Sequence, residues 1–309
     1  MRSYISKIRE LTIKPVLHSL LLKDTKKWNR MCGSLDAIES SQLAIDSYKN
    51  LNKDDIRKIG EHLIIYGLFQ ALYVQQDSVL NLCKSIDVCL EDIRTHYPEL
   101  FEIRQLRNKG IGHPSQEGSE NSTHTILIDN DSIELFSDTE TGEFSFAKYQ
   151  ISDCIEQQSK LLCGLMQKVI EKMKSIEKEH KDKYMQTKLR DCFPKDYQYP
   201  LEKIFQAINH GGDKTSLGLS HTKTLIEAIN TFQAEIKKRG LQGRDISSVC
   251  LYIDWSIYPL EKLKEYFSSK SKGTINSKDA RAYADSAELH LKELVEQVEN
   301  MDRAYESTD

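Results

Sequence analysis

Glycine and proline are scarce in this sequence, which has 14 glycines and 6 prolines among 309 residues. Because these two residue types most often interrupt helices, their scarcity favours long helices with few breaks. Long apolar runs are also lacking, and none approaches the roughly 20 residues that a membrane-spanning helix requires. We therefore expect a mainly helical protein with no membrane partner.

The sequence also lacks paired cysteines, because its seven cysteines are scattered and none forms a CxxC pair. An odd number of dispersed cysteines is typical of reduced thiols in a cytoplasmic protein. The early stretch LTIKPVLHSLLL is interrupted by Lys14, Pro15 and His18, which argues against a secretory signal. We therefore expect a cytoplasmic location.

Recognisable metal and cofactor motifs are missing as well. The histidines are dispersed without the spacing of metal ligands. The glycines of NHGGD at 209–213 are not followed by the GK[ST] of a phosphate-binding loop, and they are typical of a helix end. We therefore expect neither a metal nor a cofactor.

No large excess of positive charge is present, because the formal net charge is −4. A protein without a global basic field does not bind nucleic acid non-specifically over its whole surface. A contact with RNA has to come from a local patch. The lysine-rich stretch KVIEKMKSIEKEHKDKYMQTKLR is one candidate, although its mixed charges are also typical of a solvated helix face.

The apolar spacing predicts helices over most of the chain. Residues 1–50 are expected to be helical, with breaks at Lys14-Pro15 and around Gly33. A long helix is predicted from Asn52 or Asp54 to about Leu90, and Pro98 is expected to open the next one. Further helices are predicted at about 152–186, 200–210, 215–239, 245–270 and 277–305.

The periodicity changes to two between these helices, where HTILID, SIELFS and FSFAKYQ predict three short strands. The fold class is therefore mainly α, with a small β-hairpin or three-stranded insert at about 123–149. The stretch DCFPKDYQYP contains two prolines and predicts a domain boundary. We expect one helical domain over 1–187 and a second helical-bundle domain of unknown role over 188–309.

The segment IRQLRNKGIGHPSQ, residues 103–116, is the least ordinary part of the chain. On a helix that starts at Pro98, Arg107 shares one sector with Leu100 and Ile103, which directs its guanidinium toward the packed side. A guanidinium in that position needs a carboxylate, a phosphate or several carbonyls. The two glycines before His113 let the chain turn back, so Arg107, Asn108 and His113 are expected to converge.

This arrangement resembles the R-x4-6-H motif of the HEPN superfamily, with Asn108 directly after Arg107 and five residues between Arg107 and His113. The motif also follows a long helix, as in that family, and the resemblance covers about residues 50–186. It implies a HEPN-like four-helix bundle and a metal-independent endoribonuclease in which Arg107, Asn108 and His113 are catalytic. It further implies a homodimer that brings two motifs into one cleft.

The chemistry of these residue types fits RNA cleavage. Histidine titrates near neutrality and serves as a general base or acid for the ribose 2′-hydroxyl, whose attack gives a 2′,3′-cyclic phosphate. Arginine stabilises the charge that develops on the phosphate. RNA is the expected substrate class, with tRNA as one candidate, and a toxin or phage-defence effector with an antitoxin or other regulatory partner is one expected context.

One departure from the family concerns regulation. Some members carry a tyrosine two residues after the histidine, where it is modified with adenylate, whereas this chain has Ser115. The helix upstream contains ALYVQQDS, and four of its residues are candidates for a supporting layer around the arginine: Tyr73, Gln75, Gln76 and Asp77. For Gln75, a core amide with satisfied hydrogen bonds is the favoured interpretation, and orientation of the arginine is the other.

Other interpretations of the same residues remain open. Arg107 could pair with Asp77 or Glu61 for packing alone, and His113 could cap a helix end. In that case the protein is a non-catalytic helical binding or scaffold protein. A third interpretation is a sensor of nucleotide phosphate that uses Arg107 and His113 without cleavage.

Overall fold

The computed structural model of the chain describes residues 1–112, 123–129, 131–138, 144–210, 215–241, 247–268 and 275–306. These residues form two compact units. The N-terminal unit comprises Met1–Leu11 and Asp24–Lys174, and the C-terminal unit comprises Thr12–Lys23 and Ser175–Asp309. The predicted boundary at 187/188 therefore differs from the observed division. The short helix α2 (Pro15–Leu21) is also counted with the C-terminal unit, because its Val16 joins that unit's core.

The helices of the N-terminal unit are α1 (Arg2–Thr12), α3 (Thr25–Asn50), α4 (Lys53–Ile59), α5 (Glu61–Ser85), α6 (Ile93–His96), α7 (Pro98–Arg107) and the first part of α8 (Ile151–Tyr184). Helix α5 packs along α3 and against α7. The fold class predicted from the sequence, mainly α with a small β insert, is confirmed.

Two of the predicted helix limits are wrong. The helix expected from Asn52 or Asp54 to Leu90 is divided at Gly60, whose φ of +116° lies outside the helical region. Asn52 caps the start of α4 through a capping box with Asp55. Gly33, where a break was expected, lies inside α3, and nothing is found within 4 Å of the place where its Cβ would lie, so the helix continues through it.

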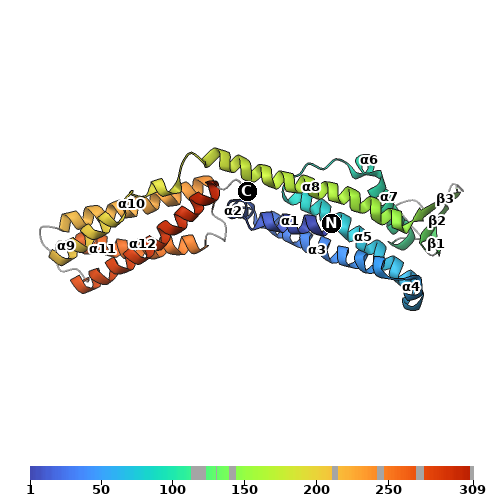
Figure 1. The fold of residues 1–309 in the computed structure, drawn as a ribbon, viewed down its shortest axis with the longest axis horizontal. Coiled ribbons are helices and arrows are strands. Elements are labelled where there is room, and N and C mark those ends of the chain that lie inside the picture. Colours follow the sequence, from blue (N-terminus) through green and yellow to red (C-terminus); the bar gives the residue numbers. More distant parts are fainter. Residues whose placement is uncertain are drawn as a thin grey trace. The chain divides into compact units, whose positions relative to one another are not determined.

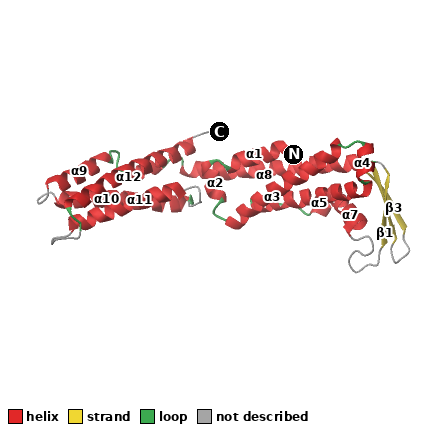
Figure 2. Ribbon diagram, turned by 90° about the horizontal axis from the view of Figure 1, so that it is seen from below, coloured by secondary structure: helices red, strands yellow, loops and turns green. Residues whose placement is uncertain are grey.

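The three predicted strands are present as β1 (Thr123–Asp129), β2 (Ser132–Asp138) and β3 (Phe144–Gln150), in the antiparallel order β1-β2-β3. Their register places alternate residues on opposite faces. One face contributes Ile133 and Leu135 to the core that α5, α7 and α8 share. Figures 1 and 2 show the sheet at the end of the N-terminal unit where α7 ends.

The C-terminal unit is a four-helix bundle of α9 (Gln198–His210), α10 (Thr215–Arg239), α11 (Ser247–Ser268) and α12 (Ser277–Glu306). Each helix contacts two others, in the cycle α9, α10, α11, α12. The unit also contains α2, the end of α8 and a 3-10 turn, η2 (Leu189–Cys192). The four bundle helices match the predicted ones to within a few residues.

A membrane-spanning segment is not found among the described residues, because no helix there is both long enough and apolar enough.

Candidate active site at the end of helix α7

Helix α7 begins with Pro98, which fits the first helical position because that position needs no N–H donor. It ends at Arg107 and continues as a wide π-helical turn, η1 (Asn108–Gly112). Gly110 is buried in this turn, and a Cβ built there would lie 2.6 Å from Cγ2 of Ile126 in β1. The turn thus lies against the sheet only because residue 110 has no side chain.

Arg107 is held by uncharged groups. Its Nε and Nη2 donate to Oε1 of Gln70 at 3.1 and 2.8 Å, and its Nη1 donates to Oδ1 of Asn108 at 3.1 Å. The guanidinium carbon also lies 4.7 Å from the ring centroid of Tyr73, which is within cation–π distance. In the described part of the chain no carboxylate lies within ion-pair distance of Arg107. No described group therefore cancels its positive charge.

Arg104, one turn earlier on α7, has the opposite environment. It forms an ion pair with Asp77, and its guanidinium carbon lies 4.5 Å from the ring centroid of the same Tyr73. Asp77 is one of the two carboxylates that the alternative, structural interpretation paired with Arg107, but it pairs with Arg104 instead. Tyr73 therefore lies against both arginines, whereas Asp77 neutralises Arg104 rather than Arg107. The supporting role expected of these two residues at the site stays a prediction.

Gly112 lies directly against the Arg107 guanidinium. A Cβ built on Gly112 would be 2.9 Å from Nη1 of Arg107, which is closer than real Cβ atoms come to other heavy atoms. A side chain at position 112 would therefore displace the guanidinium from Gln70 and Asn108. His113 lies outside the described residues, so its predicted approach to Arg107 stays a prediction.

Gln75 and Gln76 are buried in the helical core and hydrogen-bond to other glutamines. Gln76 donates to Gln158 at 2.7 Å, Gln158 donates to Gln75 at 3.0 Å, and Gln75 donates to Gln42 at 2.9 Å. Neither Gln75 nor Gln76 hydrogen-bonds to Arg107. Of the two explanations that the sequence left open for Gln75, the contacts match the core amide.

Sequence reasoning missed Gln70 and Arg104. A signal for Gln70 is present, because Gln70, Tyr73 and Asp77 are spaced by three and four residues and so share one face of α5. The same rule applies to Arg104 and Arg107 on α7. The sequence does not say that these two faces meet, and that contact is what places Gln70 next to Arg107.

The chemistry available at this site is the binding of an anion. Bonds to described residues use three of the five N–H groups of the Arg107 guanidinium. Two donors then remain for a phosphate. Among the described residues no group of three or more histidine, cysteine, aspartate or glutamate side chains could hold a metal ion.

No protein-family model, curated protein or solved structure matches the chain. The assignment of a function therefore depends on the residues themselves.

Proposed function

We propose that this protein is a metal-independent endoribonuclease that acts as a homodimer, with Arg107, Asn108 and His113 as its catalytic residues. RNA is the substrate class, and tRNA is one candidate. A toxin or phage-defence effector that is controlled by a protein partner fits this activity. A cytoplasmic location fits the seven cysteines, all of which are free thiols.

The observation that carries the proposal is the contrast between the two arginines of α7. Arg104 is neutralised by Asp77, whereas the described partners of Arg107 are the carboxamides of Gln70 and Asn108 and the face of Tyr73. A carboxamide oxygen orients a guanidinium without cancelling its charge. An arginine that serves packing alone gains more from a carboxylate, so the Arg107 environment favours an external anion such as a phosphate.

In the proposed reaction, His113 removes the proton of a ribose 2′-hydroxyl. The 2′-oxygen then attacks the adjacent phosphorus, and the bond to the 5′-oxygen breaks. The leaving oxygen takes a proton from a general acid, and the products are a 2′,3′-cyclic phosphate and a 5′-hydroxyl. Arg107 stabilises the negative charge that develops on the non-bridging oxygens.

A second protomer supplies the second acid–base group, because one histidine does not reach both sides of the phosphorus. The surface next to Arg107 supports such a pairing. Two apolar side chains precede Gln70 on the same helix, α5. Leu63, about two turns earlier, is 70% exposed, and Tyr66, one turn earlier, is 37% exposed. Exposed apolar side chains beside a candidate site are typical of an interface. A second copy of α5 that packs on Leu63 and Tyr66 brings the two motifs close together.

The test is cleavage of a total RNA pool by the purified protein in EDTA, followed by analysis of the new ends. We expect 2′,3′-cyclic phosphates from the wild type and no cleavage by folded His113→Ala or Arg107→Ala. Two surface variants on α6, His96→Ala and Arg94→Ala, are matched controls and are expected to cleave normally, since both side chains are exposed.

Two outcomes would overturn catalysis. One is a folded, dimeric wild type that leaves RNA intact; the other is equal cleavage by the wild type and by His113→Ala. If RNA or nucleotides then bind in a manner that depends on Arg107, the site is a phosphate sensor. If nothing binds, Arg107 serves packing in a scaffold protein.

A further inference from the structure

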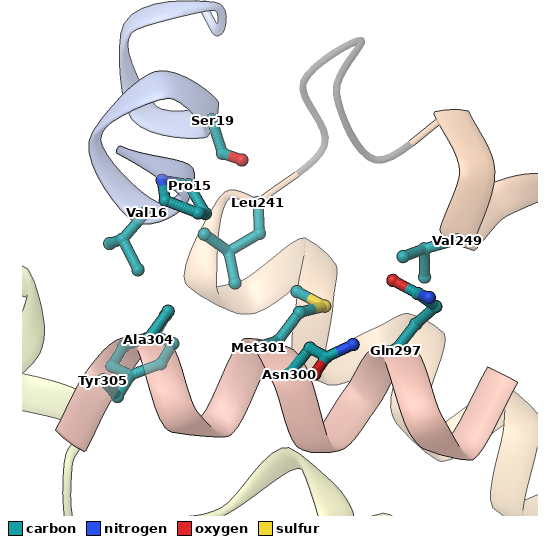
Figure 3. Close-up of a pocket in the computed structure, with 10 residues that line it drawn as sticks. All are labelled: Pro15, Val16, Ser19, Leu241, Val249, Gln297, Asn300, Met301, Ala304 and Tyr305. Carbon is teal, nitrogen blue, oxygen red and sulfur yellow. The ribbon is translucent and has the colours of Figure 1, made fainter. Parts of the chain in front are cut away.

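The C-terminal unit contains a pocket of about 250 Å³ that is separate from the Arg107 site. It lies between α2 and α12 (Figure 3). Leu241, directly after α10, and Val249, in the first turn of α11, line its remaining sides. Its lining residues are Pro15, Val16, Ser19, Leu241, Val249, Gln297, Asn300, Met301, Ala304 and Tyr305.

Among the described residues, the wall of this pocket is mostly apolar and carries no charged side chain. The Tyr305 hydroxyl is hydrogen-bonded to His180. The other polar groups are a hydroxyl from α2, that of Ser19, and two carboxamides from α12, those of Gln297 and Asn300. Arg303 donates to Oδ1 of Asn300, so the oxygen of this carboxamide is occupied. The amide nitrogen of Asn300 is on the pocket side in Figure 3 and remains a donor.

Ser19 is the unusual residue of the pocket. It is only 3% exposed, and no described residue hydrogen-bonds to its hydroxyl. A buried serine on a helix commonly donates to the carbonyl of the preceding turn, as Ser41 does to Ala37. The Ser19 hydroxyl instead points into the space above α12 (Figure 3). The hydroxyl is open to the pocket, so its donor and its acceptor are both available to a ligand there.

We propose that this pocket binds a small uncharged ligand with an apolar body and a carbonyl oxygen, such as a lactam or a neutral heterocyclic amide. The apolar wall holds the body of the ligand. Its carbonyl accepts from the Ser19 hydroxyl or from the amide nitrogen of Asn300, and the Gln297 carboxamide matches an N–H beside that carbonyl.

The size and the charge of the pocket limit the ligand. A volume of about 250 Å³ equals that of about eight liquid water molecules, at roughly 30 Å³ each. It is below the usual range for drug-sized ligands, so a compact one- or two-ring molecule fits, whereas a nucleotide does not. An anion is disfavoured, because none of the described lining residues is cationic and burial of an unpaired charge is costly.

The experiment measures binding of three probes of similar size to the full chain by isothermal titration calorimetry. The probes are quinolin-2-one, which is a neutral lactam, naphthalene, which lacks polar groups, and the anion 2-naphthoate. We expect quinolin-2-one to bind most tightly and 2-naphthoate least. Ser19→Ala should lower the affinity for quinolin-2-one by about 3- to 10-fold, which is the effect of one neutral hydrogen bond. The affinity for naphthalene should not change.

A second variant tests the location of binding. Ala304→Leu puts a larger side chain into the pocket and should abolish binding of both neutral probes. Ala282→Leu on the exposed side of α12 and Ser220→Ala on the exposed side of α10 are matched controls and should bind as the wild type does. All variants keep good helix-forming residues, and circular dichroism confirms their folding.

Three results would overturn the proposal. The first is no binding of any neutral probe to the folded protein at millimolar concentration. The second is equal binding by Ala304→Leu and the wild type, which would place the probe elsewhere. The third is tighter binding of 2-naphthoate than of quinolin-2-one. The proposed RNA cleavage is not involved in any of these measurements, so the two proposals fail independently.

Discussion

Arg107 donates two hydrogen bonds to a single oxygen of Gln70, at 3.1 Å from Nε and 2.8 Å from Nη2. The two donors lie on one edge of the guanidinium, so this contact fixes its plane as a carboxylate does in a bidentate pair. Unlike a carboxylate, however, Gln70 is neutral and does not neutralise the charge of Arg107. Gln70 therefore acts as a positioning residue that leaves Arg107 cationic.

The first prediction tests this distinction through Gln70→Glu. The glutamate keeps the shape and the hydrogen bonds of Gln70 but cancels the charge of Arg107. We expect kcat/KM for RNA cleavage to fall by about tenfold or more, which corresponds to about 1.4 kcal/mol of lost transition-state stabilisation. The free energy of unfolding should stay equal or rise by up to about 1 kcal/mol.

Gln105→Glu is the control for Gln70→Glu, because it adds the same charge two residues from Arg107, at a side chain for which no contact with Arg107 is found. General repulsion of RNA would lower kcat/KM equally in both variants. A loss in Gln70→Glu that Gln105→Glu does not share indicates the pairing with Arg107.

A second prediction concerns the buried glutamines. Gln158 accepts from Gln76 and donates to Gln75 and to the carbonyl oxygen of Leu72 at 3.1 Å. Gln158→Ala removes all three bonds and opens a cavity, so we expect a loss of roughly 3 kcal/mol in the stability of the N-terminal unit. Amide hydrogen exchange in α5 and α8 measures this loss, since it reports local opening.

Gln167→Ala, on the exposed side of α8, is the control for this variant and should change stability by no more than about 0.5 kcal/mol. If the α5 amides exchange as slowly in Gln158→Ala as in Gln167→Ala, the glutamine contacts do not stabilise the core.

A third prediction concerns the turn after Arg107. Gly110→Ala places a Cβ against Ile126, and we expect it to destabilise the N-terminal unit by about 1–3 kcal/mol, because the buried contact has no room. Gly33→Ala is the control, because nothing lies within 4 Å of its Cβ inside α3. That variant should gain up to about 1 kcal/mol, and hydrogen exchange compares the two. Equal stability of both variants would contradict the close contact between the turn and β1.

The helices and the strands could largely be predicted from the sequence, because apolar spacing and turn residues are local signals. The start of α7 at Pro98 and the strands after residue 122 follow from such signals. The division of the long helix at Gly60 could not be predicted in this way, because the apolar pattern continues on both sides of this glycine. The apolar pattern contains no signal that predicts the positive φ of Gly60.

The candidate site could be predicted only in part, for a physical reason. The position of Arg107 at a helix end follows from α7 alone. Tyr73 and Asp77 were both expected near Arg107, but only Tyr73 lies against it, whereas Asp77 pairs with Arg104. Which arginine receives the carboxylate depends on how α5 lies against α7, a contact between helices about 30 residues apart. Gln70 was missed because its role exists only through that contact.

A fourth prediction follows from His180 in the C-terminal unit. Its Nε2 donates to the carbonyl oxygen of Arg239 at 2.9 Å, which leaves Nδ1 to accept from the Tyr305 hydroxyl. Burial lowers the pKa of His180 below its ordinary value of 6.5. The hydrogen bond to Arg239 opposes this shift, whereas the charges of Lys23 and Arg239 add to it.

The unfolded chain therefore takes up a proton at His180 at a higher pH than the folded chain does. The free energy of unfolding should fall as the pH decreases through 6.5, and the fall from this group ends below its folded pKa. His180→Gln keeps a donor and an acceptor without titrating, so it should lose less stability than the wild type between pH 7 and 5. Urea denaturation at several pH values measures the difference, and His96→Gln on the exposed α6 serves as control. Parallel pH profiles for His180→Gln and the wild type would contradict the shift.

The last prediction tests the second protomer through Leu63→Glu. Leu63 is 70% exposed on α5, so a glutamate there should not disturb the fold of one chain, and circular dichroism should be unchanged. In a symmetric dimer the same position occurs on both sides of the interface, so each dimer receives two buried charges. We expect a monomer by light scattering and loss of RNA cleavage, although Arg107 and His113 are intact. Leu251→Glu, at a leucine that is 47% exposed on α11, should stay dimeric and active. If Leu63→Glu is monomeric but cleaves RNA normally, one protomer holds a complete site, and the need for a second histidine is refuted while Arg107 keeps its proposed role.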